Sequence, residues 1–309
     1  NVFSKVNIPT KGDPRDVASR FPLAIQPSNF WGDEALWSPE NPSDPHNPMM
    51  GPDGRIWLTS TVRNRLDQPE WCGEDSDNKY GQYYPLTFSI RQASVYDPAT
   101  GEFELIDTCF STHHLQMASD PDSTMYYNEI AGPAFGWVNT RLFDLTHDEE
   151  FSQGWCPQVI DTNGDGVITK PWNIPGEEAD PSLDTEVRLN MYSVIPDPNN
   201  GDIVWGANET YPGHIIRLNR GNNPPETCIS EVYQVPNPGS DPRGIDIDSN
   251  GVVWLSLAGS SHWARFDRNQ CSVTSGPGTE VGTHCENGWT LYDTDGPKFT
   301  NSDDNAGAD

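Results

Sequence analysis

The stretch DGRIWLTS at residues 53–60 decides the fold class, because variants of it recur along the chain as DSTMYYNE at 122–129, NGDIVWGA at 200–207 and NGVVWLSL at 250–257. Each copy combines turn residues with a β-branched and aromatic segment, which is typical of a tight turn followed by a strand. A single turn-and-strand unit cannot bury its own apolar face. Repetition therefore predicts that similar sheets stack on one another.

Shorter apolar segments flank each copy and complete a four-strand unit. Around the first copy they lie at 47–50, 92–96 and 102–106, and the last of them alternates polar and apolar residues. Comparable segments surround the other copies. Four short strands separated by turns form the blade of a β-propeller, so we expect an all-β propeller with four-stranded blades.

The spacing of the copies predicts long loop insertions. The equivalent aromatic residues, Trp57, Tyr126, Trp205 and Trp254, are separated by 69, 79 and 49 residues, whereas a compact blade takes roughly 40–50. We place insertions at about 66–84 and 142–189. Four blades are clear within residues 46–309, and 280–309 is either the start of a fifth or a loop. We expect about seven blades in the complete ring, with others hidden in the irregular Pro-rich segment 1–45 or lying outside this chain.

The composition limits the partners and the compartment. The chain has 18 Lys and Arg against 46 Asp and Glu, a net charge of −28, which disfavours nucleic acid and anionic membranes. It has no apolar run of about 20 residues, so we expect no membrane span. Six cysteines occur without a CxxC pair, which favours disulfides and an extracellular or periplasmic protein. Of the many pairings, we favour Cys72–Cys109 and Cys228–Cys271.

A calcium-loop pattern lies inside the second insertion. Oxygen-bearing side chains fall at the first, third, fifth and ninth positions, Gly166 at the sixth, and a backbone carbonyl at the seventh; these residues are Asp161, Asn163, Asp165, Val167 and Thr169. Trp172 occupies the twelfth position, where a bidentate Glu is usual, and Glu177, Glu178 or Asp180 could supply that ligand instead. The pattern predicts a structural Ca²⁺; the alternative is an Asx-rich turn without an ion.

Two groups of residues are candidates for chemistry at the mouth of the central channel. The first precedes inner strands and is a candidate ligand-binding and acid–base set: His46, Asn47, His113, His114, Tyr192 and Arg243. The second follows the recurring strands and could hold a second divalent metal or relay a proton: Glu209, His214 and His262. The candidate catalytic residues are His113, His114, His214, His262 and Glu209. In the alternative interpretation, all these side chains only bond neighbouring blades or lie in solvated loops.

The units at 51–59 and 242–254 resemble blades of the streptogramin lyase (virginiamycin B lyase) family, and 214–218 and 263–267 resemble its third strands. The chain is also similar to secreted bacterial propeller proteins of unknown activity. The family resemblance implies a seven-bladed ring and a magnesium-dependent lyase with His and Glu at the channel mouth. The local spacing does not allow a transfer of that site residue by residue.

We therefore expect a secreted, calcium-stabilised propeller that binds a small-molecule or carbohydrate-like ligand at its channel mouth. Whether it is an enzyme is open; an enzyme would be a metal-dependent lyase or hydrolase. The alternative is a non-catalytic binding protein or a structural subunit of an extracellular assembly, whose insertions contact further copies or a partner protein. Fold alone does not decide between these functions.

Overall fold

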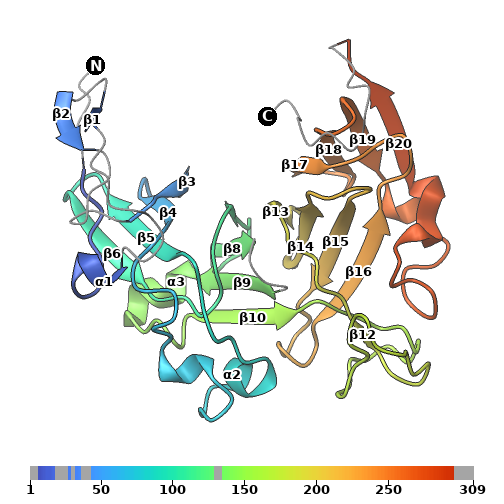
Figure 1. The fold of residues 1–309 in the computed structure, drawn as a ribbon, viewed down its shortest axis with the longest axis horizontal. Helices are drawn as coiled ribbons and strands as arrows, with labels where there is room; N and C mark the ends of the chain where they lie inside the picture. The colour runs from blue at the N-terminus through green and yellow to red at the C-terminus, as the bar shows by residue number, and fades with distance from the viewer. Residues whose placement is uncertain (1–5, 18–26, 29–31, 36–42, 129–133, 296–309) are drawn as a thin grey trace. The chain divides into compact units, whose positions relative to one another are not determined.

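A computed structural model describes residues 6–17, 27–28, 32–35, 43–128 and 134–295. The chain divides into two compact units, residues 1–115 and 116–309, and each unit is considered by itself. The protein is mostly β (Figure 1). Among the described residues, no helix combines the length and apolar character that crossing a membrane requires.

The first unit contains one four-stranded antiparallel sheet in the order β3-β4-β5-β6. The strands are β3 (His46–Met50), β4 (Ile56–Ser60), β5 (Gln92–Asp97) and β6 (Glu102–Ile106). Gly54, with φ of 87°, supplies the left-handed residue of the turn between β3 and β4. Sequential strands pair as neighbours, which is the strand order of a propeller blade. All four strands agree with the predicted unit.

The N-terminal segment of this unit holds only short elements in its described part. These are the helix α1 (Pro14–Val17) and the strand pair β1 (Pro27–Ser28) and β2 (Gly32–Ala35). The rest of residues 1–45, where a further blade was one expectation, lies largely outside the described residues.

The insertion between β4 and β5 is held by a disulfide and a buried ion pair. It contains a 3-10 turn η1 (Glu70–Cys72) and the helix α2 (Lys79–Tyr83). Cys72 is bonded to Cys109, which confirms the predicted pairing. Arg63 is buried and its guanidinium bonds the carboxylate of Asp107. Both links tie the insertion to the segment that follows β6.

The second sheet has the order β10-β9-β8-β7. Its strands are β7 (Leu115–Met117), β8 (Thr124–Asn128), β9 (Ala134–Asn139) and β10 (Gln153–Pro157), with the helix α3 (Thr140–Thr146) between the last two. Strand β10 lies within the stretch 142–189 that the sequence assigned to an insertion. Part of that stretch therefore completes a blade-like sheet.

The third sheet is a meander extended at its outer edge. The meander strands are β13 (Ser193–Asp197), β14 (Asn200–Asn208), β15 (His214–Asn219) and β16 (Ile229–Gln234). Two short strands from the insertion, β11 (Val159–Ile160) and β12 (Thr185–Glu186), continue the sheet beyond β16. β11 runs parallel to β16 and antiparallel to β12.

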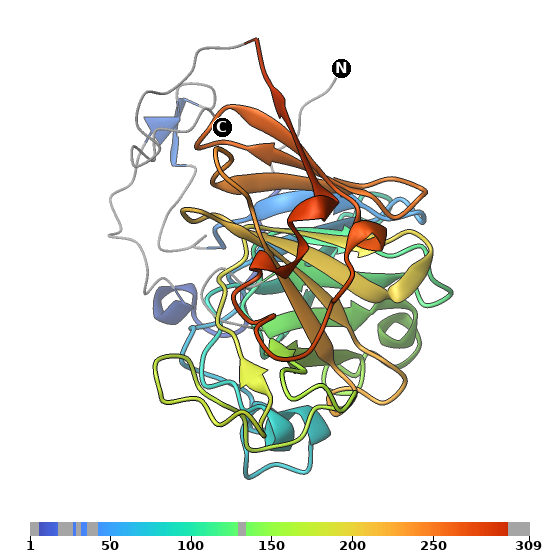
Figure 2. The same ribbon diagram turned by 90° about the vertical axis from the view of Figure 1, so that its right-hand side faces the viewer.

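The fourth sheet consists of β17 (Pro242–Ile247), β18 (Val253–Leu257), β19 (His262–Phe266) and β20 (Trp289–Asp293). Two 3-10 turns, η2 (Arg268–Gln270) and η3 (Thr283–Gly288), lie between β19 and β20. In Figure 2 the red turn η3 leads directly into β20. Residues 289–293 therefore form the outer strand of the fourth sheet, so the expectation of a fifth blade beginning at 280 was wrong for these residues.

The sheets of the second unit pack face to face in chain order. β13 lies against both β8 and β17, and the hydroxyl of Tyr126 on β8 donates to the carbonyl of Gly201 on β14 at 2.6 Å. The core between the third and fourth sheets is aromatic: Trp205, Tyr233 and Phe266 are each at most 2% exposed. Each sheet thus buries one face on the next, as the repetition predicts.

Disulfides reinforce this packing. Cys156 on β10 is bonded to Cys228 just before β16, which links the second and third sheets. Cys271 is bonded to Cys285 in the segment that joins β19 to β20. The predicted Cys228–Cys271 pairing was wrong, because Cys271 and Cys285 are both carried by the segment between β19 and β20, which brings them together. All six cysteines are paired, and such bonds persist in oxidising compartments.

Candidate functional site

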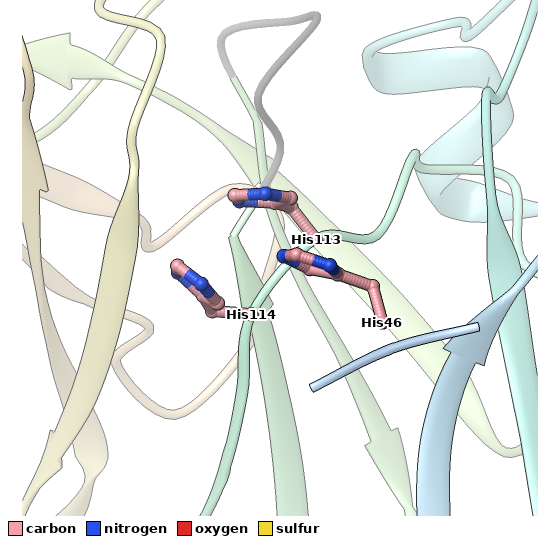
Figure 3. A group of neighbouring side chains, drawn as sticks. All are labelled: His46, His113 and His114. Carbon is pink, nitrogen blue, oxygen red and sulfur yellow. The ribbon is translucent and has the colours of Figure 1, made fainter. Parts of the chain in front are cut away.

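Three histidines of the first unit form a cluster. One ring nitrogen from each of His46, His113 and His114 lies within 4.8 Å of the others. Figure 3 shows His46 and His113 face to face with His114 beside them. The ring centroids of His46 and His113 are 4.4 Å apart at 17°, and those of His113 and His114 are 4.2 Å apart. In the described part of the chain, it is the one group of at least three His, Cys, Asp or Glu residues whose potential ligand atoms lie this close together.

A distortion at the start of β3 presents His46 to the other two rings. The pairing of β3 with β4 shifts register between His46 and Met49, and Asn47 has φ of 41°. Asn is among the few residues that tolerate the left-handed region. Such bulges bend a strand and redirect its side chains, and they are common beside functional sites. Asn47 therefore allows the left-handed backbone conformation of the bulge next to the cluster.

An ion pair holds the chain just before His46. Arg91 at the start of β5 donates to the Asp44 carboxylate at 2.7 Å and 3.1 Å, and also to the Asp44 carbonyl. Both side chains are largely buried. Since a two-point guanidinium–carboxylate contact fixes direction as well as distance, it orients the turn that delivers His46.

A buried threonine joins the two backbone segments that carry the histidines. The Thr59 hydroxyl on β4 donates to the carbonyls of both His46 and His113, each at 3.0 Å. Thr59 is fully buried. This shared hydrogen bond fixes the separation of the two chain segments, so Thr59 acts as a positioning residue for the cluster.

The environment of His46 favours its neutral imidazole form. Burial lowers the pKa of His46, and the positive charge of Arg91 lowers that pKa further, while Asp44 opposes the shift. His113 is only 7% exposed, and His114 is half-buried. Among the described residues, Nε2 of His46 and Nδ2 of Asn47 are buried without a hydrogen-bond partner. A buried unpaired polar atom is costly unless it binds something.

Neutral imidazole is the form that binds a metal ion. Zinc is commonly held by histidine nitrogens, and sites with three protein ligands keep a fourth position for water or a substrate. The cluster supplies three such donors, and His46 brings a lone pair or N–H that is otherwise unused. Its composition is unsuited to calcium or magnesium, which prefer oxygen ligands.

A second group of predicted residues meets in the other unit. The Arg243 guanidinium lies 4.9 Å from the centroid of the Tyr192 ring. It is also 3.5 Å from the carboxylates of Glu209 and Asp241. The structure thus brings together Tyr192 and Arg243, predicted as ligand-binding residues, with Glu209, predicted as catalytic. Two carboxylates balance the guanidinium charge, so the contacts also account for a purely structural role.

His214 and His262 occupy equivalent places, as the first residues of β15 and β19. Burial lowers the pKa of His214. His262 Nε2 lies 3.0 Å from the Asp293 carboxylate on the neighbouring strand. The interactions described in the structure do not join His214 or His262 to the three-histidine cluster, so their catalytic role stays a prediction.

The sequence pattern pointed to the histidines but not to the groups that hold them. His46, His113 and His114 were singled out because they precede inner strands, whereas Thr59 belongs to the recurring strand and carried no signal of its own. Arg91 and Asp44 lie 47 residues apart, so only the folded chain reveals their pairing. The single available signal was Asp44-Pro45-His46, an irregular run directly before a strand.

Comparisons with known proteins return structural matches only. No protein-family model and no curated protein matches the chain. Among solved structures, a catalytically inactive virginiamycin B lyase from Staphylococcus aureus with quinupristin aligns at 13% identity and a TM-score of 0.42, covering 82% of this chain. A periplasmic gluconolactonase from Pseudomonas aeruginosa aligns at 13% identity and a TM-score of 0.41, covering 86%.

A streptogramin B lyase structure also aligns, at 12% identity and a TM-score of 0.41, covering 82% of this chain. The chain spans 57%, 70% and 60% of the lengths of the first lyase, the second lyase and the gluconolactonase. The family that the sequence motifs resemble is therefore among the matches. Because these TM-scores lie below 0.5, the fold assignment rests on the order and packing of the sheets.

Proposed function

We propose that this chain is a secreted propeller-type protein that binds one divalent transition-metal ion, of the zinc type, through His46, His113 and His114. The metal centre is the place where the protein binds a small-molecule ligand. The observation that carries the proposal is the convergence of three imidazole donors within 4.8 Å of one another. Four meander sheets of blade order support the propeller, with a closed ring of about seven blades as the complete form. Three disulfides support an extracellular or periplasmic location.

A set of three histidine ligands is typical of a catalytic metal site with an open fourth position, whereas a structural site usually has four protein ligands. A metal ion bound by three histidines polarises a carbonyl or lowers the pKa of a bound water at its fourth position. Of the residues nearby, Asn47 offers an amide N–H to a ligand oxygen, and Thr59 keeps the histidine-bearing segments in place. We therefore propose a metal-dependent hydrolase or lyase. If the fourth coordination position proves inaccessible to a ligand, the protein is instead a non-catalytic metal-binding or ligand-binding protein.

Cobalt(II) is the probe that distinguishes these outcomes. The full chain, freed of metal by a chelator and dialysed, is titrated with Co²⁺ while its visible absorption is recorded, and azide or acetohydroxamate is then added. An open site gives a saturable spectrum at one equivalent that shifts when either anion is added. A spectrum insensitive to both anions indicates a closed site without catalytic access, and the absence of a saturable spectrum contradicts the metal centre itself.

A further inference from the structure

The calcium-loop pattern of the sequence begins where two short strands of the second unit end together. Asp161 directly follows β11, and Asp184 directly precedes β12. Because Ile160 pairs with Thr185 across these antiparallel strands, Asp161 and Asp184 emerge side by side. The topology therefore brings a carboxylate from 23 residues further along the chain to the first position of the loop.

The backbone of residues 161–169 wraps around its own side-chain oxygens. The Asp161 carboxylate accepts the N–H of Gly164 at 2.8 Å and that of Gly166 at 3.0 Å. Gly164 and Gly166 have φ of 81° and 87°, which only glycine adopts easily. The Asp184 carboxylate joins the same loop, because its Oδ2 accepts the N–H of Thr169 at 3.0 Å.

Asp184 lies outside the loop 161–169 and gives independent support for a bound cation. The residue is fully buried, and within the described part of the chain its Oδ1 has no hydrogen-bond partner. The carboxylates of Asp161 and Asp165 act on Asp184 as nearby like charges, while the backbone of Thr169 and Asn163 stabilises its charged form. A buried carboxylate with an unsatisfied oxygen and two further negative charges nearby is unfavourable unless a cation or a proton neutralises it.

We propose that Asp184 is the closing ligand of a Ca²⁺ site whose other donors are the side chains of Asp161, Asn163 and Asp165 and the carbonyl of Val167, with Thr169 at the ninth position. Asp184 supplies the carboxylate that the twelfth position usually gives and that Trp172 cannot give. Glu177, Glu178 and Asp180, the residues considered from sequence, are exposed. The Asp180 carboxylate is occupied by the hydroxyl and N–H of Ser182.

The donor set selects a hard cation and is independent of the three-histidine cluster. All of its ligands are oxygens, and six or more oxygen donors in a flexible loop suit Ca²⁺ better than the smaller Mg²⁺, which demands a regular octahedron. Three carboxylates and a doubly charged cation leave the occupied site with a net charge of only −1. The proposed metal centre of histidine nitrogens belongs to the other unit and to softer ions.

Occupancy of this loop also stabilises a neighbouring segment. The carbonyl of Asp161 accepts the N–H of Gly276 at 2.7 Å, and Gly276 lies between Cys271 and Cys285, which are disulfide-bonded. A cation that fixes Asp161 therefore also fixes the backbone contact to residues 272–284. We expect calcium to protect both segments from proteolysis.

The test compares Asp184→Asn with the control Asp180→Asn in the full chain. The asparagine keeps the size and one acceptor of Asp184 but removes its charge, and Asp180 carries the same charge on an exposed position of the same insertion. Calcium binding is measured by titration calorimetry, and the melting temperature is recorded in EGTA and in calcium up to about 10 mM, a range that covers weak extracellular sites.

We expect one calcium per chain in the parent protein, a rise in melting temperature on adding calcium, and the same behaviour in Asp180→Asn. Asp184→Asn should bind at least about tenfold more weakly. In EGTA it should melt above the parent, since the carboxylate repulsion is removed. Unchanged calcium affinity in Asp184→Asn overturns the proposal, as does a parent protein that binds no calcium. Replacing His46 or His114 should leave this calcium titration unaltered, which separates it from the proposed function.

Discussion

Zinc affinity should fall by more than about a hundredfold when either His46 or His114 is replaced by alanine. Loss of a hydrogen-bond partner behind a metal ligand already costs about 10–100-fold, and each of these substitutions removes a ligand itself. Both residues are half-buried, whereas His113 is buried, so the two variants leave the core intact. Affinity is measured by competition with a chromophoric zinc chelator at pH 7.5.

His147→Asn is the matched control for this comparison. His147 is an exposed histidine at the C-terminus of α3, with φ of 51°, and Asn tolerates that conformation. The control removes one imidazole without touching the cluster, and it should bind zinc as the parent does. Equal affinity in all four proteins would place the zinc elsewhere and refute the assignment of the three histidines.

Replacing Arg63 by methionine should lower the free energy of unfolding of the first unit by about 3–5 kcal/mol, because it removes one charge of a buried ion pair together with the hydrogen bonds of its guanidinium. The guanidinium bonds Asp107, the hydroxyl of Ser89 at 2.8 Å and the carbonyl of Thr108 at 3.1 Å. Its side chain is 5% exposed. Lys11 also approaches Asp107, with its Nζ 3.7 Å from the carboxylate, but its side chain is more exposed than that of Arg63. Urea unfolding followed by intrinsic fluorescence gives the change.

The exposed pair Arg55–Asp53 provides the comparison for Arg63. Its Nε–Oδ2 distance is 2.6 Å, yet the carboxylate is 42% exposed, so Arg55→Met should cost no more than about 1 kcal/mol. The double change Arg63→Met with Asp107→Leu should recover part of the loss, since it removes the other charge of the buried pair as well. A loss below about 1 kcal/mol for Arg63→Met would show that water or Lys11 satisfies Asp107.

Strand positions were predictable from sequence because turn chemistry and apolar segments coincide at each copy. The strands containing Trp57, Tyr126, Trp205 and Trp254 all form where the repeat places them. Strands β10 and β20 were missed, because Gln153–Pro157 follows a helix and Trp289–Asp293 follows a long loop. These segments form strands because they pair with β9 and β19, and no local sequence pattern indicates that pairing.

The candidate sites were predictable in part. Residue type and position before inner strands identified His46, His113 and His114, but the contact between their rings depends on the bulge at Asn47 and the bond from Thr59. The calcium-loop pattern was recognisable from spacing alone, whereas Asp184, the proposed closing ligand, belongs to no motif. Its place beside that loop follows from the pairing of β11 with β12, a non-local contact that a linear pattern does not contain.

The central claim is that three imidazoles of one unit bind a single transition-metal ion. X-ray absorption at the zinc edge, measured on the full chain loaded with one equivalent of zinc, tests it most directly. Our account predicts three imidazole nitrogens and one further nitrogen or oxygen donor at about 2.0–2.1 Å, with one imidazole fewer in His114→Ala. A shell made of oxygens alone, or an imidazole count unchanged in that variant, would contradict it.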